Sequence, residues 1–82
     1  MWFVYLLECA DQSLYTGITT DLERRVDEHN GSKLGARYTR SRRPVRLLYH
    51  ERYDDRSSAT QREIQIKRFS RKEKIQLTLN RE

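Results

Sequence analysis

The chain has 82 residues and a net charge of +5, from 17 Lys and Arg residues against 12 Asp and Glu residues. This length allows one domain over residues 1–82, and the five Tyr, two Phe and one Trp exclude a disordered chain. A single cysteine excludes an internal disulfide and a cysteine-based metal cluster. The positive charge favours a polyanionic partner, nucleic acid ahead of a membrane surface, although a merely basic, well-solvated surface is an alternative.

The apolar start of the chain predicts a β-hairpin. Residues 2–9 (WFVYLLEC) are β-formers without sustained alternation, which is typical of a strand covered on both faces. Turn-prone residues 10–13 lead into a second strand over residues 14–19, and so short a connection makes the two strands antiparallel. The opening run is too short to span a bilayer and has no basic leader, so we expect a cytoplasmic protein that does not contact membranes.

Three helices and a third strand follow. Each helix is predicted from a capping pattern in which a hydroxyl and an acid or amide satisfy backbone donors reciprocally. These patterns are Thr20-x-x-Glu23, Ser58-x-x-Gln61 and Ser70-x-x-Glu73. They predict helices over residues 21–30, 59–69 and 71–79, and residues 45–53 are predicted to form a strand. The order β-β-α-β-α-α predicts an α/β (α+β) domain with a small three-stranded antiparallel sheet flanked by helices.

The first predicted helix carries two polar residues beside its apolar face. At about 100° per residue, His29 falls on the face of Leu22 and Val26, and Arg25 lies at the edge of that face. A cation and an imidazole on neighbouring turns suit a phosphate site. Equally, Arg25 could cover the core with its aliphatic part while a backbone carbonyl satisfies His29.

Glu63 falls on the inward face of the second predicted helix, between Ala59 and Ile66. A carboxylate in an apolar setting must be paired, protonated or bound to a metal ion, because a bare buried charge is strongly unfavourable. The alternative to a metal site is a structural salt bridge, for which Arg62 and Lys67 supply cations.

Gly17 lies within the second predicted strand, where a glycine marks a bulge or a close approach of a backbone or ligand. Tyr5 and Tyr15 belong to the two strands of the hairpin and can project towards the same patch. Core packing is an equally good explanation of either tyrosine taken alone.

Residues 31–44 (GSKLGARYTRSRRP) form a basic segment without any acid. Most protein–DNA hydrogen bonds go to the phosphate backbone from side chains of the kinds found here. The candidate nucleic-acid-binding residues are Lys33, Arg37, Tyr38, Arg40, Arg42 and Arg43. A solvated basic loop would look similar, but the lack of a compensating acid favours nucleic-acid contact.

Taken in order, these motifs resemble the GIY-YIG nuclease superfamily, most closely its small stand-alone YhbQ-like bacterial branch. Val4-Tyr5-Leu6 is similar to the GIY motif, and Tyr15-Thr16-Gly17 is similar to the YIG motif at the family's spacing. Residues 21–30, 36–44 and 62–67 resemble the family's Arg-and-His helix, the basic segment of this branch and the metal-binding glutamate in its context. The resemblance covers nearly the whole chain and implies the GIY-YIG fold.

The resemblance implies roles for individual residues. Tyr5 and Tyr15 would position or deprotonate the nucleophile. Arg25 would hold the scissile phosphate, and His29 would assist proton removal. Glu63 would bind one divalent cation, Mg²⁺ or Mn²⁺.

Two further residues match the family in a supporting way: Gly17 is the structural glycine of the YIG motif, and Asn80 is similar to an Asn near the end of the family core. The predicted function is metal-dependent endonucleolytic hydrolysis of DNA rather than RNA, with branched or damaged structures in repair or recombination as candidate substrates. A protein partner that supplies targeting is expected, and the oligomeric state is left open. The alternatives are a non-catalytic nucleic-acid-binding module that uses the same face, and a protein-interaction domain that binds an acidic partner.

Overall fold

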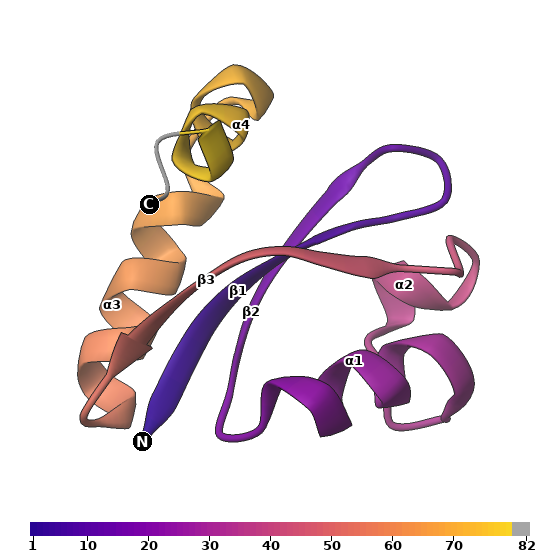
Figure 1. Ribbon diagram of the computed structural model, residues 1–82, viewed down its shortest axis with the longest axis horizontal. Coiled ribbons are helices and arrows are strands. Elements are labelled where there is room, and N and C mark those ends of the chain that lie inside the picture. The colour runs from indigo at the N-terminus through magenta and orange to yellow at the C-terminus, as the bar shows by residue number, and fades with distance from the viewer. Residues whose placement is uncertain (80–82) are drawn as a thin grey trace.

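The computed structural model describes residues 1–79, which form a three-stranded sheet and four helices (Figure 1). The strands are β1 (Trp2–Glu8), β2 (Leu14–Thr19) and β3 (Arg46–Tyr53). The helices are α1 (Leu22–Gly31), α2 (Arg37–Arg40), α3 (Arg56–Lys67) and α4 (Arg71–Leu79). The predicted sheet and the order of its long elements are confirmed, and the strand bounds agree with the prediction to within one residue. Asn80 lies outside the described residues.

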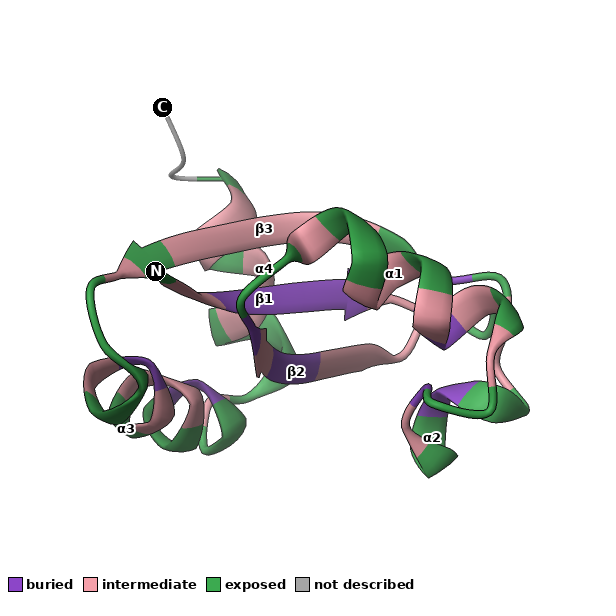
Figure 2. Cartoon of the chain, turned by 90° about the horizontal axis from the view of Figure 1, so that it is seen from below, coloured by how far each residue is buried: buried purple, intermediate pink, exposed green. Residues whose placement is uncertain are grey.

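β1 is the central strand of the sheet, and both of its neighbours run antiparallel to it. Residues 4–7 of this strand are at most 2% exposed, and Figure 2 shows β1 buried between two less buried strands. The predicted strand covered on both faces is therefore confirmed, and its continuous apolar run follows from this position.

Alternate residues of β1 belong to two separate cores, one on each face of the sheet. Val4 and Leu6 pack against α3, whereas Tyr5 and Leu7 pack against α1. The two helices consequently lie on opposite sides of the strands (Figure 1). Residues of the two helices are therefore separated by the sheet, and a site that uses both must include residues of the strands between them.

Two of the three predicted helix caps are wrong. The Asp21 carboxylate accepts the Arg24 backbone N–H at 3.0 Å and caps α1, a role predicted for Thr20. In α3, the Asp55 carboxylate accepts the backbone N–H of Ser58 at 2.7 Å, and Ser58 itself lies inside the helix. In both places an aspartate stands where the chain enters the helix, and its negative charge also favours the positive end of the helix dipole.

The third predicted cap is confirmed. The Glu73 carboxylate accepts the Ser70 backbone N–H at 2.8 Å, and the Ser70 hydroxyl accepts the Glu73 backbone N–H at 3.1 Å. Because of its different cap, α3 begins at Arg56 instead of residue 59. It ends at Lys67 instead of residue 69. No helix within residues 1–79 is both long and apolar enough to cross a membrane.

The basic segment contains the single-turn helix α2, which the sequence analysis did not predict. Its N-cap residue, Ala36, makes no side-chain capping bond, and Thr39 is the residue of this helix that is buried. So short a helix is unstable on its own propensity. Tertiary contacts of Thr39, described below, hold it in place.

Candidate active site

Three aromatic side chains from three elements meet at the centre of the site. The Tyr5 hydroxyl of β1 and Nε2 of His29 in α1 are hydrogen-bonded at 2.9 Å, and both residues are buried. Tyr15 of β2 lies beside them, with its ring centroid 6.4 Å from that of Tyr5 and 5.2 Å from that of His29. The fold thus brings together both tyrosines and the histidine that the sequence singled out.

Gly17 makes room for the Tyr5 ring. The two residues are direct partners in the register of β1 and β2. A Cβ atom on Gly17 would lie 2.6 Å from Cζ of Tyr5, far inside van der Waals contact. The Tyr5 ring therefore lies across the Gly17 backbone, which is the close approach that a glycine within a strand indicates.

Nδ1 of His29 is held by Thr39, a residue that the sequence analysis did not single out. Nδ1 lies 2.8 Å from Thr39 Oγ1, and this hydroxyl donates to the Ala36 carbonyl at 2.9 Å. The Ala36 backbone nitrogen lies 3.4 Å from Nδ1. No periodic signal marks Thr39, because the surrounding segment is polar and α2 is too short to show an apolar repeat.

Burial holds both hydrogen-bonded groups in their neutral forms. It raises the pKa of Tyr5 to about 12, which the positive charge of Arg25 opposes and the negative charge of Glu63 reinforces. It lowers the pKa of His29 to about 4, and Arg25 acts in the same direction. At neutral pH, Tyr5 is therefore an uncharged phenol and His29 an imidazole with one protonated and one acceptor nitrogen.

Arg25 lies half-buried beside this pair. Its Nη1 donates to Glu28 Oε1 at 2.8 Å and to the Leu34 carbonyl at 2.7 Å. Its charge also lowers the pKa of Tyr5, which places the guanidinium within electrostatic range of the hydroxyl. The arginine is thus held in a defined position next to the buried tyrosine.

Glu63 belongs to α3, on the other face of the sheet. Its side chain is 17% exposed, and Oε2 lies 3.4 Å from Nζ of Lys67, one turn further along the helix. Because its charge raises the pKa of Tyr5, the carboxylate acts on the same hydroxyl as Arg25. The ion pair with Lys67 is half exposed and therefore weak, so a stronger cation can replace it.

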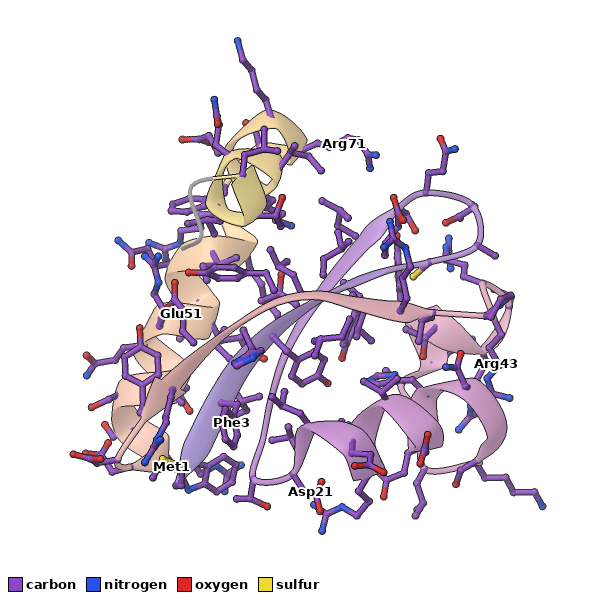
Figure 3. The ribbon with its side chains drawn as sticks, in the orientation of Figure 1. Met1, Phe3, Asp21, Arg43, Glu51 and Arg71 are labelled. Carbon is purple, nitrogen blue, oxygen red and sulfur yellow. The ribbon has the colours of Figure 1, made fainter. Side chains whose placement is uncertain are left out.

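Two cations of the basic segment brace the structure. Arg43 donates to the carbonyls of His29 and Ser32, the latter at 2.6 Å, and so places a positive charge at the C-terminal end of α1 (Figure 3). Arg42 donates to Asp11 Oδ2 at 3.0 Å. Asp11 lies outside the segment and supplies the acid that the segment itself lacks.

Other members of the basic segment face the solvent. Lys33, Arg37, Tyr38 and Arg40 are exposed, and Arg40 donates to the Lys33 carbonyl at 3.0 Å. The Tyr38 ring stacks with that of Tyr15 at a centroid distance of 5.9 Å. An exposed aromatic ring therefore connects this basic surface with the centre of the site.

Comparison with known proteins bears directly on this arrangement. A family model described as the GIY-YIG catalytic domain matches residues 1–76. The chain belongs to the GIY-YIG family. This confirms the resemblance drawn from the motifs, and GIY-YIG is a nuclease family whose members generally depend on a divalent metal ion and bind DNA.

Relatives of this GIY-YIG protein include UPF0213 proteins. One from Desulfotalea psychrophila is 62% identical over 69 residues, which are 84% of this chain and 63% of that protein, so the match spans less than two thirds of its length. Another, from Syntrophus aciditrophicus, is 55% identical over 75 residues, 92% of this chain and 86% of that protein. These names state no activity.

Solved structures of two relatives share the fold of this GIY-YIG protein. The solution NMR structure of a UPF0213 protein from Bacillus halodurans is 45% identical, with a TM-score of 0.58, and the match covers 94% of this chain and 82% of that one. An NMR structure from E. faecalis is 46% identical, with a TM-score of 0.61, and covers 90% and 78%. The predicted fold class is thereby confirmed.

The residues of this GIY-YIG protein fit a divalent ion such as Mg²⁺, which needs few ligands from the protein. Within residues 1–79, no group of three or more His, Cys, Asp or Glu side chains is placed to hold a metal ion. Glu63 offers one half-buried carboxylate in electrostatic range of Tyr5. Mg²⁺ commonly keeps several waters and is held by one or two carboxylates together with substrate phosphates. The donor set therefore fits an ion shared between Glu63 and a phosphate, and does not form an all-protein cage.

Proposed function

We propose that the protein is a metal-dependent endonuclease that hydrolyses DNA phosphodiester bonds. The observation that carries this proposal is the buried Tyr5–His29 hydrogen bond, around which Tyr15, Arg25 and Glu63 are gathered from β2, α1 and α3. Hydrolysis of a phosphodiester needs a route for the proton of the attacking water and a means of stabilising charge on the phosphate. These five residues offer both.

Proton removal falls to Tyr5 and His29. Tyr5 can take a proton from the attacking water while it passes its own proton to Nε2 of His29. In the resting protein this transfer is unfavourable, because burial raises the pKa of Tyr5 to about 12 and lowers that of His29 to about 4. The transfer therefore belongs to the substrate complex. A divalent cation held by Glu63 would there offset the carboxylate charge, which is one of the smaller causes of the raised pKa of Tyr5.

Arg25 would hold the phosphate, and Glu63 would hold a divalent ion beside it. Such an ion supplies Lewis-acid stabilisation of the phosphate and of the leaving oxygen. Arg25 offsets charge on the non-bridging oxygens. Its hydrogen bonds to Glu28 and to the Leu34 carbonyl keep the guanidinium in place before substrate arrives.

The exposed part of the basic segment supplies the DNA-binding surface. Lys33, Arg37 and Arg40 are suited to phosphate contacts, which position a duplex without reading its sequence. Tyr38 links this surface to Tyr15 at the active site. Branched or damaged DNA is the proposed substrate, and a partner protein is proposed to supply targeting.

Cleavage of supercoiled plasmid and of labelled branched DNA tests the proposal. The wild-type protein is expected to nick DNA with Mg²⁺ or Mn²⁺ and to stop when EDTA is added. Glu63→Gln keeps the size of the side chain but removes its charge, so we expect cleavage to fall by on the order of 100-fold or more. Retardation of DNA in gels is expected to be unchanged, because Glu63 makes no part of the basic surface.

The matched control is Glu23→Gln, which makes the same change of charge on the exposed side of α1 and should cleave like the wild type. Wild-type cleavage by Glu63→Gln would show that the metal is assigned to the wrong residue. If the wild type retards DNA but cuts neither substrate with either metal, the non-catalytic binding module becomes the better description.

A further inference from the structure

Thr39 is a buried hydroxyl in the otherwise exposed α2 helix. The residue is 0% exposed, whereas its neighbours Tyr38 and Arg40 are exposed. Its hydroxyl touches Nδ1 of His29, the nitrogen that faces away from Tyr5. Thr39 therefore stands behind the histidine rather than in contact with the space a substrate would occupy.

The direction of the hydrogen bonds follows from the Tyr5 hydroxyl. This hydroxyl is buried, so its hydrogen must have an acceptor. Arg25, whose charge lowers the pKa of this hydroxyl, can only donate hydrogen bonds and offers it no acceptor. Among the described residues, Nε2 of His29 is then the acceptor, and it must carry no hydrogen.

The proton of the neutral imidazole consequently lies on Nδ1. Thr39 Oγ1, at 2.8 Å, is placed to accept it, and the Thr39 hydroxyl passes its own hydrogen to the Ala36 carbonyl at 2.9 Å. The Ala36 backbone N–H also points at Nδ1, but at 3.4 Å it is at the weak end of hydrogen-bond lengths, and the Thr39 hydroxyl at 2.8 Å is the closer partner. One directed chain therefore runs from Tyr5 through His29 and Thr39 to the backbone of α2.

We propose that Thr39 is a positioning residue of the nuclease site, whose hydroxyl holds His29 in the Nδ1–H tautomer and so keeps Nε2 open to the Tyr5 proton. This inference rests on the proposed nuclease function for its consequence in catalysis. Its structural part, the tautomer of His29, stands independently of any substrate. The basic segment would therefore have two roles: its exposed cations contact phosphates, and its Thr39 holds His29 of α1.

The tautomer can be observed directly by long-range ¹H–¹⁵N NMR of the imidazole nitrogens in the full chain at neutral pH. We expect the wild-type His29 signals to show a protonated Nδ1 and an unprotonated Nε2. Thr39→Val keeps the shape of the side chain but removes the hydroxyl, and should move His29 towards the Nε2–H tautomer, whereas Thr39→Ser should keep the wild-type pattern. A His50→Gln variant assigns the signals, because the chain has two histidines.

A wild-type His29 protonated at Nε2 would overturn the proposal, and this holds even if Thr39→Val fails to fold. An unchanged tautomer in folded Thr39→Val would overturn it as well. In cleavage assays, kcat should fall on the order of 100-fold in Thr39→Val and recover in Thr39→Ser, with KM little changed, as expected when a base is held in the wrong tautomer. Equal cleavage by Thr39→Val and the wild type would count against the catalytic part. If the wild type cuts nothing, the nuclease function fails while the NMR result still decides the tautomer.

Discussion

Tyr5 and His29 acquire their chemistry from burial as much as from their identity. A polar group tolerates an apolar setting only when it is hydrogen-bonded, and it then favours its neutral form. The 2.9 Å bond between the two side chains satisfies one atom of each, and burial moves the pKa of each towards the neutral side. The same burial thus leaves an acceptor histidine next to an intact phenol at neutral pH.

Gly17→Ala tests whether the position of the Tyr5 ring depends on the glycine. The added Cβ would lie 2.6 Å from Cζ of Tyr5, and the ring cannot stay where it is. We expect the free energy of unfolding to fall by about 1–3 kcal/mol, as in other overpacked cores, and cleavage to be lost with the Tyr5–His29 hydrogen bond. Urea unfolding and the plasmid assay measure the two effects.

Gly31→Ala is the matched control, because a Cβ on Gly31 meets no atom within 4 Å. Gly31 is the last residue of α1, where alanine is the better helix former. Its free energy of unfolding should stay the same or rise by up to about 1 kcal/mol, with cleavage retained. A similar loss in both variants would mean that the effect of Gly17→Ala does not come from the clash with the Tyr5 ring.

At the scale of the elements, the start of α1 depends on one residue among several candidates. Thr19, Thr20 and Asp21 are all residues that cap helices well. In the structure, Thr19 accepts the Asp21 backbone N–H at 3.2 Å, while the Asp21 carboxylate caps the helix. The path of the chain leaving β2 makes this choice, because it decides which side chain faces the open backbone N–H groups.

Asp21→Ala is expected to lower the free energy of unfolding by about 1 kcal/mol, the usual loss for a helix cap. Thr20→Ala, which removes the hydroxyl named by the sequence pattern, should change it by less than about 0.5 kcal/mol, as most surface substitutions do. Urea unfolding of the two variants beside the wild type makes the comparison. The reverse order would restore Thr20 as the cap.

At the scale of the whole molecule, one acidic residue joins α3 to the sheet in addition to the apolar packing against Val4 and Leu6. The Glu51 carboxylate of β3 accepts hydrogen bonds from Nε and Nη2 of Arg62, at 2.8 and 2.9 Å, and from the Tyr53 hydroxyl at 2.7 Å. Arg62 precedes Glu63 on α3, so this tie limits the rotation of the helix that presents the proposed metal ligand. The proposed metal ligand is thereby kept at a defined place on its face of the sheet.

The stability of the whole chain should depend on pH through His29. The pKa of His29 is lowered to about 4 in the folded protein, so the unfolded chain, with a value near 6.5, takes up the proton first. Stability from this group is complete above pH 6.5 and is lost as the pH falls towards 4. Between pH 7.5 and 5.5 we expect the free energy of unfolding to drop by about 1.4 kcal/mol, measured by urea unfolding.

His29→Gln supplies the control for this pH dependence. The variant has no titrating group at this position, so its free energy of unfolding should change much less over the same interval, in which carboxylates stay largely ionised. An equal drop in the variant would assign the effect to other groups. The comparison isolates His29 from the second histidine of the chain, which both proteins retain.

Much of the fold followed from local patterns. The run of β-formers over residues 2–9, without sustained alternation, indicates a strand covered on both faces. The period of residues 22, 26 and 29 places His29 inward, because side-chain direction repeats with the backbone geometry. The motifs with Tyr5, Tyr15 and Glu63 were sufficient to indicate the family, since their spacing along the chain is itself local information. The predicted helix caps were wrong where several good capping residues lie close together in the sequence.

The sequence by itself thus determined the order of the long elements, the residues that face the core and the family. Only the tertiary structure decided which polar groups meet. The Tyr5–His29 bond joins residues 24 apart, and Thr39 finds His29 across a loop of the basic segment. Composition also does not distinguish the two arginines of the basic segment: Arg43 donates to a carbonyl at the end of α1, whereas Arg37 faces solvent. The physical reason is that a hydrogen bond depends on distance and direction in space, which patterns of residue type along the chain do not encode.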